Sequence, residues 1–474
     1  MPAGLGILAL GMIGAPLLFF LAWRRPTLAL TVWILSSVVF SEYILLPEAP
    51  TLHLHLSRVL LAALLLGLAA GWIPQRTRSA TPARPEFLIA ALTLWTIISA
   101  CWAGTIFRVD ATRNVSQFLT GFVLPGLMLY LARSFPLSLR ASRTVCALLT
   151  LLLGYMVFTA FCEHFHLDSL VFPQYILDPS LGIHTERARG PIVNAAENGG
   201  IIAILLLAAL HSVLYATGGA MRWASCIGLF LVGIPALWFT ESRGPWLAFA
   251  GGLLVMLWHK QARGFLLALG GAGLLVLATV IVASSVSAGD LVKKDPLPQR
   301  SDNTSDTTEF RMELYRESIG PFEDHPVIGW GLGTFTDEDY LFDAYGSSLN
   351  LSVQVLHDTI VAITLESGII GGILYVAFLL TAALTLIRRR GASPSLEKRD
   401  FYTLSLASLA VFVINGLFVD NRFFMPQNAL VFFLVGLGLA LAPTDRLQPA
   451  QYAAGPAPPQ EIAAWSLRPC GNGS

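Results

Sequence analysis

His357 and Asp358 stand together where a polar stretch gives way to a long apolar one, and Glu366 follows inside the apolar stretch. An imidazole with a carboxylate neighbour titrates near neutral pH and suits general-base work, such as taking a proton from a hydroxyl. The alternative is a histidine that caps or packs the helix. Glu366 favours a functional interpretation, because placing an ionisable group within an apolar span costs free energy and such groups are usually functional.

The segment RARGPIVNAAENGG offers a second candidate, Arg189, with Arg187 competing for the same role. A Gly-Pro turn follows the arginines, and Asn194 or Asn198 could cap the apolar helix that comes next. A guanidinium fork holds phosphate oxygens in pairs. The alternative is a loop-to-helix junction whose arginines are simply solvated.

Two further arginines complete the set. Arg243 lies in TESRGPW between two apolar stretches, and Arg311 lies in FRMELYRESIGPF, one helical turn before Tyr315. Helix N-termini attract anions, although Arg243 could also reach toward water and pair with Glu241. The segment 305–322 begins with a capping box and predicts an amphipathic helix on the membrane surface. Several arginines and one histidine suit an anionic ligand such as a pyrophosphate.

Other kinds of site are disfavoured. The run Asp337–Asp339 is more simply a solvated loop than a metal site, so we predict no metal and no cofactor. The glycines of 325–333 do not form a dinucleotide fingerprint, because no strand precedes them. The chain has neither the paired acids of a glycosidase nor a G-x-S-x-G elbow. Five scattered cysteines form no C-x-x-C pair.

The composition predicts what positions these residues. Of 474 residues, 55% are hydrophobic and 13% are charged, whereas soluble domains carry about 25% charged residues. The net charge is zero, so nothing indicates a nucleic-acid partner. The sequence predicts an all-α polytopic membrane protein in a lipid bilayer, with one large external loop that contains short amphipathic helices.

Hydropathy predicts twelve or thirteen transmembrane helices, because two pairs of apolar stretches are joined by very short turns. The expected spans are 4–23, 27–46, 56–73, 87–105, 114–133, 144–162, 199–218, 223–240, 245–259, 264–284, 358–387, 402–420 and 423–442. The first lacks the basic start and cleavage site of a removable signal peptide. One set of short loops holds sixteen lysines and arginines and the alternate set holds five. The first set is therefore expected in the cytoplasm, with the working face outside it.

Three regions follow from this pattern. Residues 1–162 are expected to form N-terminal transmembrane helices, and 163–442 a membrane region that carries the candidate site and the external loop 285–357. The tail 443–474 is rich in proline, alanine and glycine and is expected to be disordered on the cytoplasmic side.

The chain resembles the O-antigen ligase and polymerase superfamily of bacterial membrane glycosyltransferases. The resemblance is strongest over 185–440 and rests on four segments in family order: RARGPIVNAAENGG, TESRGPW, FRMELYRESIGPFEDHPVIGWGLGTF and HDTIVAITLESGIIGG. It implies a GT-C-like protein of the cytoplasmic (inner) membrane, with its site on the periplasmic side. It also implies metal-independent, inverting transfer of a glycan from undecaprenyl pyrophosphate to an acceptor hydroxyl.

The resemblance also implies residue roles. Arg243, Arg311 and Arg189 would bind the pyrophosphate, and His357 would be the catalytic base. Asp358 departs from the asparagine or serine that the family often has after this histidine. Asp358, Glu366 and Tyr315 are expected to support the site.

The sequence does not identify the acceptor of the glycan. Ligation to a lipid A-core acceptor is expected first, with polymerisation of O-antigen or exopolysaccharide repeat units and protein O-glycosylation as alternatives. A polysaccharide flippase or exporter is a rival of another class, for which His211 and Asn415 are the main polar residues within the spans. A non-catalytic membrane scaffold is a second rival.

Overall fold

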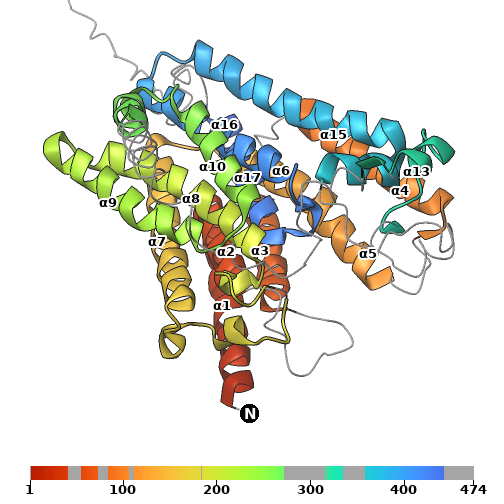
Figure 1. The fold of residues 1–474 in the computed structure, drawn as a ribbon, viewed down its shortest axis with the longest axis horizontal. Helices are drawn as coiled ribbons and strands as arrows, with labels where there is room; N and C mark the ends of the chain where they lie inside the picture. The colour runs from red at the N-terminus through yellow and green to blue at the C-terminus, as the bar shows by residue number, and fades with distance from the viewer. Residues whose placement is uncertain are drawn as a thin grey trace, which may run out of the picture.

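The computed structural model describes residues 2–40, 55–72, 84–105, 111–182, 184–271, 315–316, 318–334 and 358–441. Within these ranges the chain is a bundle of α-helices without an extended β-strand (Figure 1). Among the described residues, six helices are long and apolar enough to cross a membrane. The predicted all-α polytopic membrane class is confirmed, and each predicted span contains a helix among its described residues.

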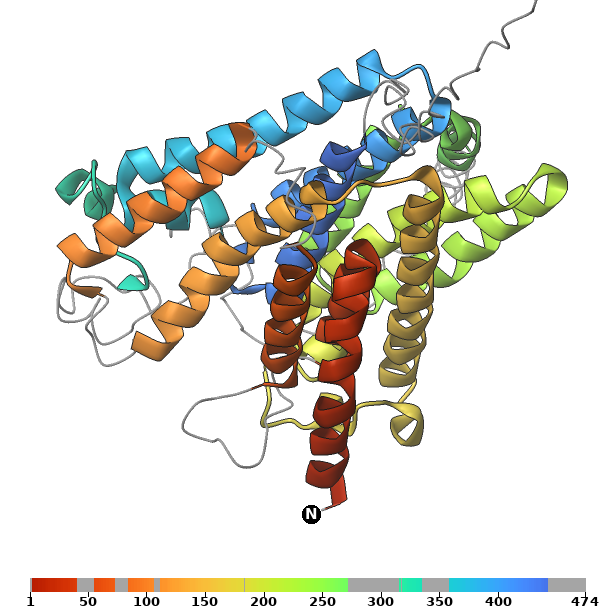
Figure 2. The ribbon, with the colours of Figure 1, turned by 180° about the vertical axis from the view of Figure 1, so that it is seen from behind.

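Three N-terminal helices form one group, coloured red at the lower centre of Figure 2. They are α1 (Pro2–Arg24), α2 (Pro26–Val39) and α3 (Leu56–Trp72). Gly67 of α3 allows close packing on α1, because a Cβ there would lie 2.4 Å from the carbonyl oxygen of Phe19. Small residues at such crossings let helix backbones approach each other. Helix α2 continues inward and contacts α7 and α17.

The predicted span 114–133 is one helix with an irregular turn in it. Helix α4 (Arg84–Trp102) is followed by α5 (Ala111–Phe118), the π-helical turn η3 (Leu119–Val123) and α6 (Leu124–Ser134). The last three run on without a break in the chain direction. A π-helical turn inside an α-helix frequently marks a functional region, and η3 contacts the turn between the last two helices.

Four helices follow in order: α7 (Leu139–His164), α8 (Ala195–Ala216), α9 (Gly219–Trp238) and α10 (Arg243–Met256). Another helical stretch occupies 260–271. The side chain of Asn194 accepts hydrogen bonds from the amides of Ala196 and Glu197. The predicted N-cap of this helix is thereby confirmed, with Asn194 rather than Asn198 in the role.

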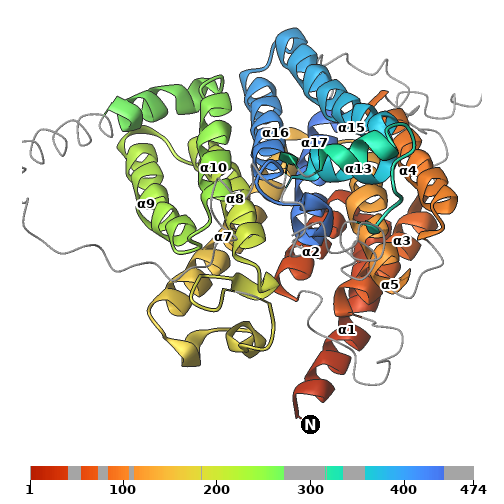
Figure 3. The same cartoon turned by 45° about the vertical axis from the view of Figure 1, so that its right-hand side comes forward.

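The C-terminal half contains α13 (Ile319–Asp324), α15 (Thr359–Ala392), α16 (Leu396–Asn415), the 3₁₀ turn η10 (Asn421–Phe423) and α17 (Met425–Ala440). Helix α15 lies beside α4, with α13 close to its first turns (Figure 3). Its backbone is not helical at Gly368. The helix is therefore two segments joined by a break.

Helix α8 is central and α9 is peripheral. The most apolar window of α8 is 78% buried inside the protein, whereas that of α9 is 28% buried. Helices α10, α16 and α17 pack around α8. Large apolar side chains on the outer helices, such as Leu151 and Leu231, are exposed. Such a surface is suited to lipid, and the buried centre fixes the helix ends that carry the candidate residues.

Candidate functional site

The turn between α16 and α17, residues 415–423, holds the beginning of α15. The amide of Thr359 donates to the carbonyl oxygen of Gly416 at 2.8 Å. The Thr359 hydroxyl donates to the carbonyl oxygen of Val419 at 3.1 Å and accepts from the amide of Asn421 at 2.9 Å. These three bonds fix the first residue of α15 on the turn.

Asp358 caps α15 and links it to the segment that contains Tyr315. Its Oδ1 accepts from the amides of Ile360 at 2.8 Å and Val361 at 3.0 Å, which satisfies two free donors of the helix end. The hydroxyl of Tyr315 donates to its Oδ2 at 3.3 Å. Burial raises the pKa of Asp358 above its ordinary value, although both amides act in the opposite direction. His357 directly precedes this cap and lies outside the described residues.

The beginning of α10 reaches the same turn from the other side. A Cβ at Gly244 would lie 2.8 Å from Cβ of Phe418 and 3.2 Å from Oδ1 of Asn415, so α10 approaches the turn closely. Arg243 is the first residue of α10, and its side chain is exposed. In the part of the chain that the structure describes, Arg243 forms no ion pair with Glu241 or another acid.

A buried ion-pair cluster lies under the 415–423 turn. The guanidinium of Arg422 pairs with the carboxylate of Glu366 and, at 2.6 Å, with that of Asp420. All three side chains are at most 2% exposed. We call these three residues the Arg422 cluster. Two carboxylates neutralise Arg422, so its role is to join α15 to the turn rather than to bind an anion.

The break in α15 follows directly after Glu366. Gly368 has φ of +66°, a conformation that favours glycine. The carbonyl oxygen of Glu366 accepts from the amide of Gly331 at 2.9 Å, and the amide of Ile369 donates to the carbonyl oxygen of Pro326 at 2.8 Å. Irregular backbone at membrane depth is tolerated where protein satisfies its polar groups, as happens here.

The glycine-rich turn 325–333 has a structural explanation. A Cβ at Gly329 would lie 2.4 Å from the amide nitrogen of Gly368. Gly329, Gly331 and Gly333 all have positive φ. Position 329 therefore needs glycine because the backbone there presses directly against the break in α15, and the positive φ values favour glycine at positions 331 and 333.

Helix α4 closes the other side of the break. The indole of Trp95 donates to the carbonyl oxygen of Ser367 at 2.7 Å, and the hydroxyl of Ser99 donates to that of Glu366 at 2.8 Å. The break is thus held from three directions: by the glycine-rich turn, by α4 and by the Arg422 cluster.

A buried amide network lies beside the Arg422 cluster. The side-chain amide of Asn415 lies 3.5 Å from Oδ1 of Asn421 and 3.4 Å from Oε1 of Gln427. The backbone amide of Gln427 donates to Oε1 of Glu197 in the first turn of α8. The first turns of α8, α10, α15 and α17 therefore meet around one turn.

Arg189 is placed differently from Arg243. Its side chain is 2% exposed, and its guanidinium donates to the carbonyl oxygens of Ile176, Asp178 and Leu181. Its backbone amide donates to the carboxylate of Glu163 at 2.8 Å. These contacts tie the connection between α7 and α8 together and occupy the planar fork.

That connection lies next to the turn that precedes α10. The amide of Ala188 donates to the carbonyl oxygen of Phe239 at 2.9 Å, and the side-chain amide of Asn198 donates to the carbonyl oxygen of Ala188 at 2.9 Å. Phe239 lies four residues before Arg243. Arg189 thus helps to set the position of the turn that bears Arg243.

The structure brings four of the predicted residues to one region. Arg243, Asp358, Tyr315 and Glu366 all lie on or beside the 415–423 turn or on elements bound to it. Arg189 lies in the adjoining connection. The remaining candidates are outside the described residues: His357, Arg311 and Asp337–Asp339.

Sequence reasoning missed Asp420, Asn421 and Arg422 as parts of this region. Three consecutive polar residues between two apolar spans were the available signal. Because Glu366 lies in another span, a buried partner for it could have been sought among these residues.

Residues 228–376 match the family model described as O-antigen ligase. No curated protein matches the sequence. The matched region begins within α9 and ends in α15 beyond the break, so it includes Arg243, Arg311, His357 and Glu366.

Proposed function

We propose, from the membership of residues 228–376 in the O-antigen ligase superfamily, that this protein transfers a glycan from undecaprenyl pyrophosphate to an acceptor hydroxyl. The family supports lipid-linked glycan transfer in O-antigen biosynthesis. Ligation to a lipid A-core sugar is the form of the reaction that we propose. The transfer would take place on the periplasmic face of the bacterial inner membrane.

One observation carries the proposal. The 415–423 turn holds the beginnings of both α10 and α15, through the contact of Gly244 with Phe418 and the three bonds of Thr359. Arg243 is the first residue of α10, and His357 comes two residues before Thr359. This turn therefore holds the start of α10, which bears Arg243, and it also holds Thr359, which follows the proposed base His357 by two residues in the sequence.

The proposed donor site uses exposed positive charge. Arg243 has no partner within the described residues, so its guanidinium can hold pyrophosphate oxygens and stabilise the charge of the leaving group. Arg311 comes four residues before Tyr315 in the sequence, and we assign it the same role because the hydroxyl of Tyr315 contacts Asp358. Arg189 then serves by positioning the turn before α10.

The proposed base is His357. Its imidazole takes the proton of the acceptor hydroxyl while the acceptor oxygen attacks the anomeric carbon. The bond from that carbon to the pyrophosphate oxygen breaks, and undecaprenyl pyrophosphate leaves with the electron pair. Attack opposite the leaving group inverts the anomeric centre. The leaving group is already activated, so orientation, charge stabilisation and one proton acceptor are sufficient, and no metal is required.

The test uses purified full-length protein in detergent with undecaprenyl-pyrophosphate-linked oligosaccharide and a lipid A-core acceptor, with and without EDTA. Released carrier pyrophosphate and the mass of the glycosylated product are measured. We expect transfer that survives EDTA, and a loss of at least 100-fold in His357→Ala and Arg243→Ala.

Arg263→Ala is the matched control, since Arg263 is also an exposed arginine but lies beyond the opposite end of α10. It should retain wild-type transfer. Product mass identifies the acceptor, so a lengthened lipid-linked repeat or a glycosylated peptide would replace ligation by polymerisation or protein glycosylation. Full activity without His357 would refute the mechanism. No transfer to any acceptor would favour the exporter.

A further inference from the structure

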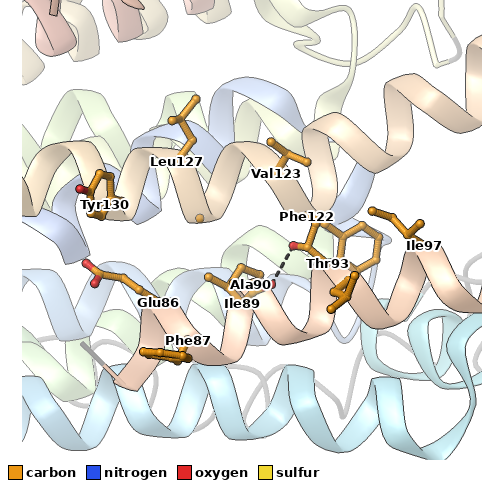
Figure 4. Close-up of a pocket in the computed structure, with 12 residues that line it drawn as sticks. Glu86, Phe87, Ile89, Ala90, Thr93, Ile97, Phe122, Val123, Leu127 and Tyr130 are labelled. Carbon is orange, nitrogen blue, oxygen red and sulfur yellow. Dashed lines mark hydrogen bonds between the residues drawn. The ribbon is translucent and has the colours of Figure 1, made fainter. Parts of the chain in front are cut away.

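An apolar groove lies between α4 and α6, outside the region described above. Its volume is about 570 Å³, which is within the range of pockets that hold small ligands. Glu86 and Tyr130 lie near one end and Ile97 near the other (Figure 4). Small residues on both helices make the hollow, with Ala90 and Thr93 on α4 and Gly126 on α6.

Few of the side chains that line the groove are polar. The Thr93 hydroxyl donates to the carbonyl oxygen of Ile89 within its own helix at 2.7 Å. Glu86 at the end of the groove forms an ion pair with Arg133. Most other lining side chains are apolar, including the exposed Leu94. A long hydrocarbon chain matches this lining better than a polar ligand does.

The other end of the groove reaches the proposed site. Phe122 and Val123 line it and belong to η3. A Cβ at the preceding Gly121 would lie 2.8 Å from Cβ of Arg422. On α4, Ile97 lies two residues before Ser99, whose hydroxyl binds the break in α15. The groove therefore begins behind the Arg422 cluster and runs away from it along the helices.

We propose that this groove holds part of the polyprenyl chain of the glycan donor, an inference that rests on the proposed function. A chain attached to a pyrophosphate at the 415–423 turn must pass into the hydrocarbon, and the groove starts beside that turn. From Glu86 to Ile97, α4 rises about 16 Å, roughly half the hydrocarbon thickness. One groove between two helices suits a single chain, as in a polyprenyl lipid, rather than the paired chains of a phospholipid.

Two neighbouring alanines provide a matched pair of variants. Ala90 and Ala91 are both exposed on α4, but only Ala90 lines the groove. Ala90→Trp fills the groove without entering the helix core, and Ala91→Trp adds the same side chain beside it. We expect Ala90→Trp to raise the KM for the undecaprenyl-linked donor about tenfold at unchanged kcat, corresponding to about 1.4 kcal/mol of lost binding. Ala91→Trp should match wild type.

A donor with only two isoprene units, too short to occupy the groove, should be used equally by all three proteins. Equal KM values of Ala90→Trp and Ala91→Trp for the long-chain donor would overturn the inference. This comparison requires active enzyme, so a binding measurement without turnover accompanies it.

The binding measurement uses undecaprenyl pyrophosphate that carries a photoactivatable diazirine near the pyrophosphate and no glycan. We expect cross-links to α4 and α6 in wild type and Ala91→Trp, and at least a fivefold loss in Ala90→Trp. A diazirine phospholipid that labels the same helices and resists competition by undecaprenyl pyrophosphate would overturn the inference. Groove labelling in a protein without transfer activity would contradict the proposed reaction alone.

Discussion

Two buried polar clusters lie at opposite ends of the central helices, and their surroundings differ. The Arg422 cluster lies near the beginning of α8. At the other end, His211 contacts His259 at 3.0 Å between ring nitrogens, and His259 lies 3.3 Å from the carboxylate of Asp400. Tyr215 donates to that carboxylate at 2.8 Å. We call these four residues the His211 cluster.

Burial of charge alone does not distinguish the two clusters. Glu197 and His211 are separated by about 21 Å along α8. The Arg422 cluster is buried, and so are His211, His259 and Asp400, whereas Tyr215 is only partly buried. The His211 cluster joins the ends of regular helices. The Arg422 cluster instead joins a broken helix to a turn that also holds Arg243, an exposed cation. What a buried cluster positions therefore indicates function better than how buried it is.

The two polar residues weighed for the exporter hypothesis lie in different networks. Asn415 belongs to the amide network beside the Arg422 cluster, and His211 belongs to the other cluster. The two residues that could have marked a polar path through the membrane thus lie in separate networks at opposite ends of the bundle.

The largest expected effect comes from removing the central charge of the Arg422 cluster. Arg422→Ala leaves the carboxylates of Glu366 and Asp420 buried without a counter-ion, which should lower the free energy of unfolding by about 3–5 kcal/mol. Thermal unfolding in detergent measures this effect. Neutralising both acids in the same chain (E366Q, D420N) should restore part of the loss. An unfolding temperature of Arg422→Ala like that of wild type would show that the Arg422 cluster contributes little to stability.

Gly368→Ala should come second. A Cβ at this position would lie 2.0 Å from the carbonyl oxygen of Val327, and the positive φ is unfavourable for alanine. We expect a destabilisation of about 3 kcal/mol and reduced transfer. Gly391→Ala in the same helix is the control, because no neighbouring atom lies within 4 Å of its added Cβ. Equal behaviour of the two variants would show that the break tolerates a regular residue.

Asp400→Ala tests the second cluster. It removes the acceptor of the Tyr215 hydroxyl and of the Lys260 amide, at an expected cost of about 2 kcal/mol in unfolding free energy. Specific activity of the folded fraction, measured at saturating donor, should stay at the wild-type level. A fall in that activity would make the His211 cluster part of the working region and abolish the contrast between the two ends.

The smallest effect on stability is expected for Asp358→Asn. Asparagine is an equally good N-cap, so the unfolding free energy at pH 7 should change by less than about 1 kcal/mol. Burial raises the pKa of Asp358, so the folded wild type holds this proton more tightly than the unfolded chain does. Its stability should therefore fall as pH rises from the ordinary value of 3.8 through the raised one.

Asp358→Asn has no ionisable side chain at this position, so its stability lacks this dependence on pH. Stability curves of wild type and variant against pH should diverge over that window, with wild type gaining relative to Asp358→Asn as the pH is lowered. Parallel curves would contradict the raised pKa.

The helical class was predictable because composition and apolar length determine it directly. The cap at Asn194 was predictable for a similar reason, since a polar residue before an apolar run is a local signal. The pairing of Glu366 with Arg422 joins residues 56 positions apart, and no local pattern encodes it. The single-span expectation for 114–133 also concealed the π-helical turn, which only tertiary packing explains.

Arg189 and Arg243 also show that a local sequence pattern does not determine the surroundings of a side chain. Arg189 and Arg243 both precede a Gly-Pro pair and looked alike in sequence. Their difference comes from three carbonyl oxygens contributed by the connection between α7 and α8, which surround one guanidinium and leave the other exposed. Motif similarity could nominate both residues, but it could not separate an exposed arginine from one that holds a loop.

The break in α15 has a consequence for the order in which the chain is synthesised. Trp95, Ser99 and the glycine-rich turn all precede α15, so the donors that satisfy the break have left the ribosome before it emerges. Arg422 follows α15 by a whole helix. The carboxylate of Glu366 must therefore enter the bilayer ahead of its counter-ion. A chain that stops before residue 422 would keep an uncompensated charge there, and quality-control proteases could recognise that defect.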